Sequence, residues 1–230
     1  MLLKKSHLIT IILILFSLPT DAKIYVVSTA ALLTNQADHR EKEYIQSLRI
    51  IKKLGFTPYI IEACKKKGPT FFERYTPHVF YSTMNDPVLH NKGVNEGKTM
   101  LEGLKAFHFE DDDIIIKTTG RYHFISDYFV RMVKNNPNTD AFFLLIAADQ
   151  QVLTSCFAMR YKHLITMLES FDYNDMETNM ISIETICADY IKNSHQQNTL
   201  RVLFVDKVDI QGRMFFWGHT SIDKLPLSTW

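Results

Sequence analysis

Two hydrophobic patterns alternate along the chain, one typical of buried strands and one typical of amphipathic helices. Short runs rich in β-branched and aromatic residues predict strands at residues 23–29, 57–63, 78–82, 114–116, 141–147, 152–159, 201–208 and 213–217. Apolar residues at helical spacing predict helices at residues 36–54, 91–107, 125–133, 161–171 and 180–192. This alternation of strand and helix is typical of an α/β protein.

Single residues mark where several of these elements begin and end. Gly55 follows the first helical pattern and predicts its end, because glycine suits the left-handed conformation of a helix C-terminus. Pro58 stands at the start of a predicted strand, where its missing N–H is tolerated. Asn91 predicts a helix start, since its side chain can cap free N–H groups. The isoleucines at 114–116 are apolar toward both faces and predict the middle of a covered parallel sheet.

The elements together predict a single α/β domain over residues 23–220. We expect a mostly parallel sheet with helices on both faces, because parallel strands need crossover helices and those helices cover the sheet. No internal repeat or linker interrupts the pattern. Residues 221–230 are expected to form a C-terminal tail.

Residues 1–22 are expected to lie outside this fold. Lys4 and Lys5 precede an apolar run over residues 8–18, and Ala22 suits the position before a cleavage site. The run is short for a membrane span, which takes about 20 residues, so a cleaved signal peptide is favoured over an uncleaved anchor. Both forms predict export or residence in a secretory lumen, and only the anchor predicts attachment to a membrane.

Composition and charge narrow the class further. The 230 residues are 46% hydrophobic and 22% charged, as in a globular protein. The 26 basic and 25 acidic residues nearly cancel, which argues against a protein that binds nucleic acid through its bulk charge. The three cysteines (Cys64, Cys156 and Cys187) allow one disulfide with one thiol left over, or plain buried thiols.

Charged residues flank the central predicted strand at both ends. Asp111, Asp112 and Asp113 precede it, so we expect a solvated acidic turn at its amino end rather than a metal site. Ligands of such sheets bind at the opposite, carboxyl edge, where strands end and loops begin. The residues that leave this edge, 117–122 (KTTGRY), combine two cations, two threonine hydroxyls and a glycine in one turn. That combination is suited to binding an anion such as a phosphate.

A second feature suited to anions lies one β/α unit earlier. Asn91, Lys92 and Gly93 stand at a predicted helix start, where free N–H groups and a partial positive charge favour an anion. Capping alone also explains Asn91, and Glu96 is placed one turn later, where it can pair with Lys92. Since the two turns belong to successive units, we expect both at the same edge of the sheet.

These two runs carry a resemblance to a known family. Residues 91–96 (NKGVNE) and 115–122 (IIKTTGRY) resemble the NKG..E and IIK.TGRY signatures of small glycosyltransferase-like proteins, relatives of the GT-A, or nucleotide-diphospho-sugar transferase, fold. The similarity extends from residue 23 to about residue 217, and the TGRY turn is its most specific part. The resemblance implies a single domain that binds a nucleotide sugar at the carboxyl edge.

The GT-A fold usually carries an Asp-x-Asp that holds a divalent metal at the end of a central strand. In this chain Thr119, Gly120 and Arg121 occupy the corresponding place. The resemblance therefore implies a donor site in which cations replace the metal, and it puts a requirement for manganese or magnesium in doubt. No other cofactor is expected.

On this hypothesis the site residues fall into two groups. The residues expected to bind the nucleotide and its diphosphate are Ser28, Thr29, Arg40, Asn91, Lys92, Gly93, Lys117, Thr119, Gly120 and Arg121. Glu184 and Asp149 are the candidates for orienting or deprotonating an acceptor hydroxyl, since one lies on an apolar helical face and the other ends a predicted strand. For Glu184 the alternative is an ordinary, partly exposed helix residue.

Two functions of different classes remain open. The first is an enzyme of the hexosyltransferase type, which transfers a sugar from a nucleotide-diphosphate donor to a hydroxyl of a glycan, protein or lipid. The second is a non-catalytic module of the same fold that binds nucleotides or carbohydrates. A nucleic-acid partner is expected for neither.

The cations of the TGRY turn predict donor binding without a metal. We expect a nucleoside diphosphate to bind the chain equally well in the presence of EDTA, because Arg121 can grip phosphate through two parallel hydrogen bonds. Isothermal titration with and without EDTA, and then with manganese, measures this. Binding that appears only with manganese would contradict the prediction.

Overall fold

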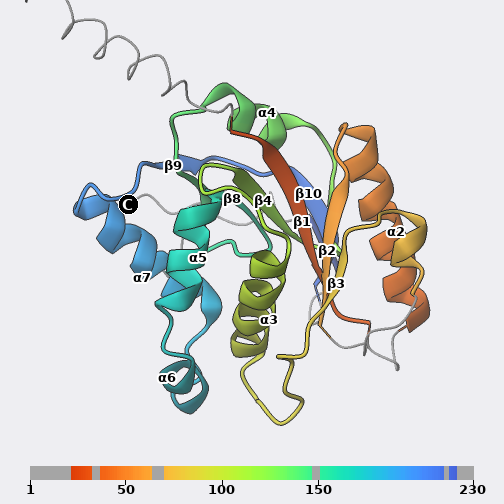
Figure 1. Cartoon of the computed structure of the whole chain (residues 1–230), viewed down its shortest axis with the longest axis horizontal. Coiled ribbons are helices and arrows are strands. Elements are labelled where there is room, and N and C mark those ends of the chain that lie inside the picture. The colour runs from red at the N-terminus through yellow and green to blue at the C-terminus, as the bar shows by residue number, and fades with distance from the viewer. Residues whose placement is uncertain (1–21, 33–36, 64–69, 147–150, 215–217, 222–230) are drawn as a thin grey trace, which may run out of the picture.

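A mixed sheet runs through the protein (Figure 1). The structure is a computed structural model that describes residues 22–32, 37–63, 70–146, 151–214 and 218–221. The strands of the large sheet are β1 (Ile24–Ala30), β2 (Pro58–Glu62), β3 (Val79–Tyr81), β4 (Ile114–Thr119), β6 (Ala141–Ile146), β7 (Gln151–Val152), β8 (Cys156–Arg160) and β9 (Val202–Val205). A smaller sheet contains β5 (His123–Phe124), β10 (Ile210–Met214) and β11 (Gly218–Ser221).

The sheet confirms the predicted α/β class. Its strand order is β3-β2-β1-β4-β8-β6-β7, with β9 paired to β6. The pairs β1–β2, β1–β4, β2–β3 and β6–β9 are parallel. Strand β8 is antiparallel to both β4 and β6, and therefore joins the two parallel parts of the sheet.

Helices cover both faces of the sheet, as predicted (Figure 1). They are α2 (Ala37–Lys53), α3 (Lys92–Ala106), α4 (Tyr128–Asn135), α5 (Tyr161–Glu169), α6 (Tyr173–Thr178) and α7 (Ile183–Gln196), besides the 3₁₀-helix η2 (Phe72–Arg74). On one face, Ile115 packs into a core with residues of α3, α5 and α7. On the other face, Ile114 and Ile116 pack against residues of α2 and α4. Strand β4 is apolar toward both sides because each side meets a helix layer.

Local signals set several of the boundaries as expected. Gly55 has a φ of 87°, the left-handed conformation that ends α2. Pro58 is the first residue of β2. The side chain of Asn91 caps α3 by accepting a hydrogen bond from the backbone N–H of Gly93.

Other boundaries differ from the prediction. The helix predicted from residue 180 begins at Ile183, where Ser182 caps it, and a separate short helix, α6, precedes it. Met180 separates the two helices with a φ of 53°. The helix predicted from residue 125 begins at Tyr128, and the closing strand predicted from residue 213 begins at Ile210. At α7, apolar spacing missed the start because the Ser182 cap and the left-handed conformation of Met180 place it.

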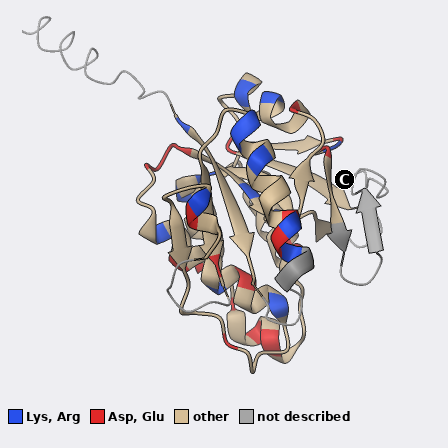
Figure 2. Cartoon of the chain, turned by 90° about the vertical axis from the view of Figure 1, so that its right-hand side faces the viewer, with Lys and Arg blue, Asp and Glu red and all other residues tan. Residues whose placement is uncertain are grey.

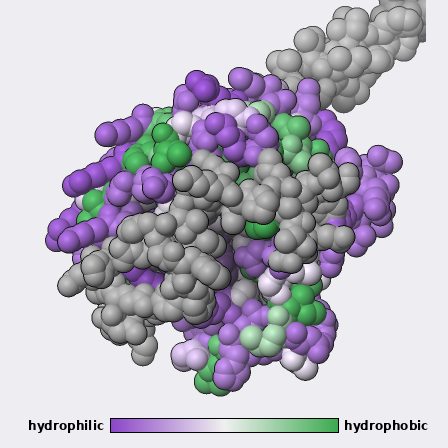
Figure 3. Space-filling model, turned by 180° about the vertical axis from the view of Figure 1, so that it is seen from behind, coloured by the Kyte–Doolittle hydropathy of each residue, from purple (hydrophilic) through white to green (hydrophobic). Residues whose placement is uncertain are grey.

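On the sides seen in Figures 2 and 3, the described residues form no large patch of one charge or of hydrophobic side chains. Basic and acidic residues both occur on the side seen in Figure 2. From behind, hydrophobic residues form separate small patches among hydrophilic ones (Figure 3). Cys156 and Cys187 are buried, and Cys64 lies outside the described residues. Within the described part of the chain, no helix has both the length and the apolar character to cross a membrane.

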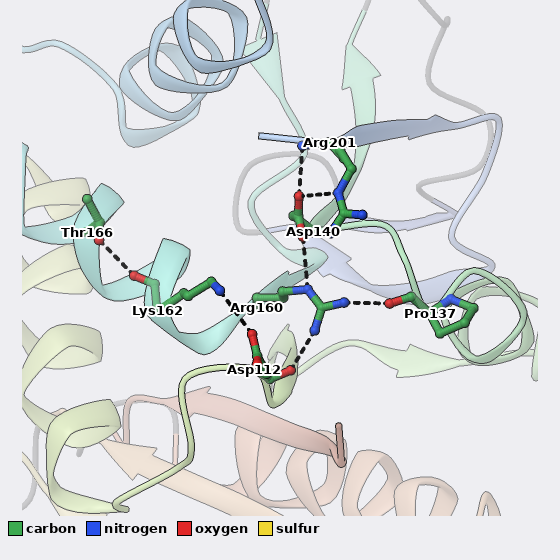
Figure 4. Close-up of polar contacts among 7 residues, drawn as sticks. All are labelled: Asp112, Pro137, Asp140, Arg160, Lys162, Thr166 and Arg201. Atoms are coloured by element: carbon green, nitrogen blue, oxygen red, sulfur yellow. Dashed lines mark hydrogen bonds and ion pairs between the residues drawn. The ribbon is translucent and has the colours of Figure 1, made fainter. Parts of the chain in front are cut away.

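At the amino edge of the sheet, one carboxylate ties three strands together (Figure 4). Asp140, just before β6, accepts hydrogen bonds from Arg160 Nε of β8 at 2.9 Å and from Arg201 Nε and Nη2, beside β9, at 2.9 and 2.8 Å. Arg160 also donates to the backbone carbonyl of Asp112 at 2.9 Å, beside β4. Burial alone would raise the pKa of the Asp140 carboxyl, but the bonds from Arg201 and Arg160 hold it far below its ordinary value of 3.8.

Replacing this carboxylate should weaken the fold. We expect Asp140→Asn to lower the free energy of unfolding by about 3 kcal/mol, because it leaves the largely buried Arg160 without its charged partner. Urea denaturation at neutral pH measures the difference.

The pH dependence of this stability difference provides the control. The Asp140 carboxyl has a lower pKa in the folded chain than in the unfolded chain, so its stabilising contribution is complete above pH 3.8 and is lost as the pH falls below that value. The stability difference between the wild type and Asp140→Asn should therefore shrink in acid. A constant difference from neutral pH to pH 2 would contradict this account.

Candidate functional site

The predicted anion-binding turn lies at the carboxyl ends of two neighbouring parallel strands. Strand β4 ends at Thr119, and Thr119 lies beside Thr29 of β1 in the sheet register. The backbone N–H of Gly120 donates to the carbonyl of Thr29 at 2.8 Å, and the N–H of Tyr122 donates to the carbonyl of Thr119 at 2.8 Å. These bonds fold residues 119–122 into a tight turn over the end of β1.

Helix α2 holds this turn in place from the side. Ser47 Oγ donates to the carbonyl of Tyr122 at 2.8 Å. The ring of Tyr44 packs so closely on Gly120 that a Cβ there would lie 2.9 Å from it. The turn therefore needs glycine at position 120 for its packing against α2.

Arg40 and Tyr44 of α2 meet at the backbone of Ala31, just after β1. Arg40 is buried and its Nη1 donates to the carbonyl of Ala31 at 2.8 Å, and Tyr44 Oη accepts from the N–H of Ala31 at 2.9 Å. Burial raises the pKa of the Tyr44 phenol and the charge of Glu62 raises it further, while its hydrogen bond with Ala31 and the charges of Arg40 and Arg121 act to lower it. The carboxyl ends of β1 and β4 thus carry the cations Arg40 and Arg121 together with the buried carboxylate of Glu62.

The hydroxyl residues expected to contact a nucleotide have different surroundings. Ser28 is buried, and its Oγ shares a hydrogen bond of 2.9 Å with Thr118 Oγ1. Thr29, one residue later, points to the opposite face and is half-buried, as is Thr119 beside it. Of these residues, Thr29 and Thr119 retain an exposed portion at the edge.

Lys117 is directed into the protein. Its side chain is 1% exposed, and its Nζ donates to Glu96 Oε1 of α3 at 2.5 Å, to the carbonyl of Thr154 at 2.7 Å and to Thr119 Oγ1 at 3.2 Å. Glu96, expected to pair with Lys92, thus forms an ion pair with Lys117. The structure brings this lysine to the carboxyl edge, with protein atoms around its ammonium group.

Glu184 lies next to this ion pair. It stands in the first turn of α7, half-buried, and accepts a hydrogen bond of 2.8 Å from Thr154 Oγ1. Burial raises the pKa of the Cys187 thiol, and the charge of Glu184 raises it further while that of Lys117 lowers it. The charges of Glu184, Lys117 and Glu96 thus all act on one buried thiol. Asp149, the other acceptor-side candidate, lies outside the described residues.

The helix start at Asn91 packs against α6 and α7. Asn91 Nδ2 donates to the carbonyls of Met176 and Ile181, both at 2.8 Å. A Cβ on Gly93 would lie 3.1 Å from Ile183, so the glycine allows α7 to come close. Lys92, between them, is exposed. Asn91 and Gly93 thus have packing roles here, and their contact with a diphosphate stays a prediction.

The acidic triplet lies at the far edge, as expected, but Asp113 is buried rather than solvated. The carboxylate of Asp113 accepts hydrogen bonds from the backbone N–H groups of Lys23 at 3.0 Å and Glu110 at 2.9 Å. Asp112 forms an exposed ion pair of 3.0 Å with Lys162. Both precede β4, at the end opposite to the TGRY turn.

Sequence reasoning missed three residues of the site, Tyr44, Glu96 and Thr154. Tyr44 followed the apolar helical pattern and was expected only in the core. Glu96 belongs to the NKG..E run, which was a usable signal, but its partner is 21 positions away. Thr154 stands within residues 152–159, which were predicted as one strand, but the structure has two strands there, β7 and β8, and Thr154 lies in the turn between them. Nothing in its local pattern marks it.

Comparisons with known proteins give likenesses in structure only. No protein-family model matches the chain, and no curated protein is similar to it in sequence. A glycosyltransferase involved in the glycosylation of the major capsid of PBCV-1 is 8% identical with a TM-score of 0.48, covering 80% of this chain and 81% of that one. A cytidylyltransferase from Leptospira borgpetersenii serovar Hardjo-bovis is 10% identical with a TM-score of 0.42, over 80% and 76%. A 4-diphosphocytidyl-2C-methyl-D-erythritol synthase is 10% identical with a TM-score of 0.49, over 80% and 88%.

The packing of the TGRY turn can be tested through its glycine. We expect Gly120→Ala to lower the free energy of unfolding by about 1–3 kcal/mol, because the added methyl group overlaps the Tyr44 ring. Chemical denaturation measures the loss. In a Tyr44→Leu background the same change should cost less, and an equal cost in both backgrounds would contradict the contact.

Proposed function

We propose that this chain is a glycosyltransferase that takes a sugar from a nucleotide-diphosphate donor and transfers it to a hydroxyl group. The observation that supports it most is the placement of two arginines at the carboxyl ends of β1 and β4: Arg121 is half-buried in the TGRY turn, and Arg40 of α2 donates to the carbonyl of Ala31 just after β1. Open α/β sheets bind ligands at this edge. Two guanidinium groups there suit an anionic ligand, and the resemblance of the two motifs specifies a nucleotide sugar.

The donor's diphosphate would lie against the TGRY turn. As the bond between the sugar and the diphosphate breaks, its electron pair leaves with the phosphate oxygen, so negative charge develops on the leaving group. The guanidinium of Arg121 would offset that charge. Thr29 and Thr119, half-buried at the same edge, would contact the nucleotide or its phosphates.

The acceptor would lie on the side of α7. Its hydroxyl oxygen forms the new bond to the anomeric carbon, and its proton must pass to a base. Glu184 is half-buried beside Thr154 and is suited to take that proton. Asp149 remains a second candidate from the sequence. The acceptor class, a glycan, protein or lipid, and export through residues 1–22 are parts of the same proposal.

A binding screen tests the function with a matched control. We expect at least one diphosphate of uridine, guanosine, cytidine or adenosine to raise the melting temperature of the wild type, because ligands that bind the folded state stabilise it. Arg121→Ala should weaken that binding about 10- to 100-fold, the loss expected for hydrogen bonds to a charged group. The control Asp111→Asn/Asp112→Asn, at the opposite edge, should bind like the wild type.

The outcomes separate the two open functions. Release of the nucleoside diphosphate from the corresponding nucleotide sugar, measured by chromatography, would support the enzyme. Binding without any release in the presence of glycan acceptors would favour the non-catalytic module. If no nucleotide stabilises the wild type at millimolar concentration, the proposal is wrong.

A further inference from the structure

The ammonium group of Lys117 has its hydrogens directed to protein acceptors. A lysine ammonium has three N–H bonds to donate. Glu96 Oε1, the carbonyl of Thr154 and Thr119 Oγ1 lie 2.5, 2.7 and 3.2 Å from Nζ, and the side chain is 1% exposed. A phosphate could bind this nitrogen only by displacing one of these partners. The geometry therefore argues against a direct contact between Lys117 and a diphosphate.

The charges around Lys117 also argue against a contact with a diphosphate. Glu96 of α3 pairs with it directly, and Glu184 of α7 is joined to it through Thr154, whose carbonyl accepts from Lys117 and whose hydroxyl donates to Glu184. One cation thus stands between two carboxylates. Because the two carboxylates outnumber the one cation, this cluster repels an anionic diphosphate. The hydroxyl groups of a sugar, by contrast, can donate to carboxylate oxygens.

We infer that Lys117 is a positioning residue of the acceptor side, which fixes Glu96 and, through Thr154, Glu184. This inference rests on the proposed function and replaces, for Lys117 and for the α3 start at Lys92, the diphosphate contact expected from the sequence. It divides the carboxyl edge into two halves. The half beside α2, with Arg40 and Arg121, takes the donor's diphosphate, and the half between α3 and α7 takes a hydroxyl-bearing acceptor.

The division assigns Glu96 a part in the reaction. Its side chain is 30% exposed, so one carboxylate oxygen can bind Lys117 while the group still meets an acceptor. Glu184 takes the proton of the attacking hydroxyl, and Glu96 holds a second hydroxyl of the acceptor. Lys117 has no contact with either substrate and keeps the two carboxylates in place.

Binding and turnover are measured separately to test this. The probes are the nucleoside diphosphate found in the screen, by isothermal titration, and release of that diphosphate from its nucleotide sugar with a panel of neutral oligosaccharide acceptors. We expect Lys117→Met to bind the diphosphate within about threefold of the wild type, and its kcat to fall about 100-fold, the size typical of a lost acid–base arrangement. Arg121→Ala, the matched control, should show the opposite pattern, with weakened binding.

A second variant guards against misfolding of the first. Glu96→Gln keeps the shape and an oxygen that accepts from Lys117, so we expect a folded protein with unchanged diphosphate binding and a reduced kcat. Adding Glu96→Gln to Lys117→Met should restore part of the melting temperature that Lys117→Met alone loses, because it removes the carboxylate left without its cation.

Each outcome of these measurements bears on the inference. Diphosphate binding that falls in Lys117→Met as much as in Arg121→Ala would overturn the inference and leave the proposed function standing. Full turnover in Glu96→Gln would overturn it as well. A wild type that binds none of the diphosphates would overturn the proposed function and the inference together.

Discussion

The burial of one ammonium group constrains both the fold and the site. Lys117 lies near the end of the central strand β4, where an unpaired charge would cost several kcal/mol or more. Its partners come from α3 and from the segment before β8, so these elements must meet at one point for the charge to be tolerated. The contacts that stabilise the buried charge also bring two carboxylates to this corner of the fold. Glu96 binds Lys117 directly, and Glu184 accepts from Thr154, whose carbonyl binds Lys117. Structure and chemistry therefore share the same contacts here.

The two edges of the sheet use charge differently. At the amino edge, Asp140 is nearly buried and its oxygens are occupied by Arg160 and Arg201, which locks β6, β8 and β9 together. At the carboxyl edge, Arg121 and Glu184 are half-buried and stand at the ends of elements, so part of each side chain is exposed. A rigid amino edge thus supports a carboxyl edge whose polar groups retain exposure.

The carboxyl edge is itself divided by β4. On the side of β1 and α2, the turn at Gly120 is packed against Tyr44, and Arg40 donates to the nearby carbonyl of Ala31. On the side of α3 and α7, carboxylates gather around Lys117. Two arginines beside the buried carboxylate of Glu62 on one side, and two carboxylates around a lysine on the other, are suited to a reaction with an anionic leaving group and a hydroxyl nucleophile. This electrostatic division is what makes a transfer between two substrates the best-supported proposal for the site.

The sequence by itself determined the elements, because strands and helices follow local patterns. Three isoleucines predicted the covered central strand, Gly55 and Asn91 marked helix ends, and the order of elements placed the TGRY turn at the carboxyl edge. Only the tertiary structure decided which groups meet. The antiparallel insertion of β8, the separate helix α6 and the pairing of Lys117 with Glu96 join residues far apart in the chain. Such contacts depend on how whole elements pack, and no local spacing encodes them.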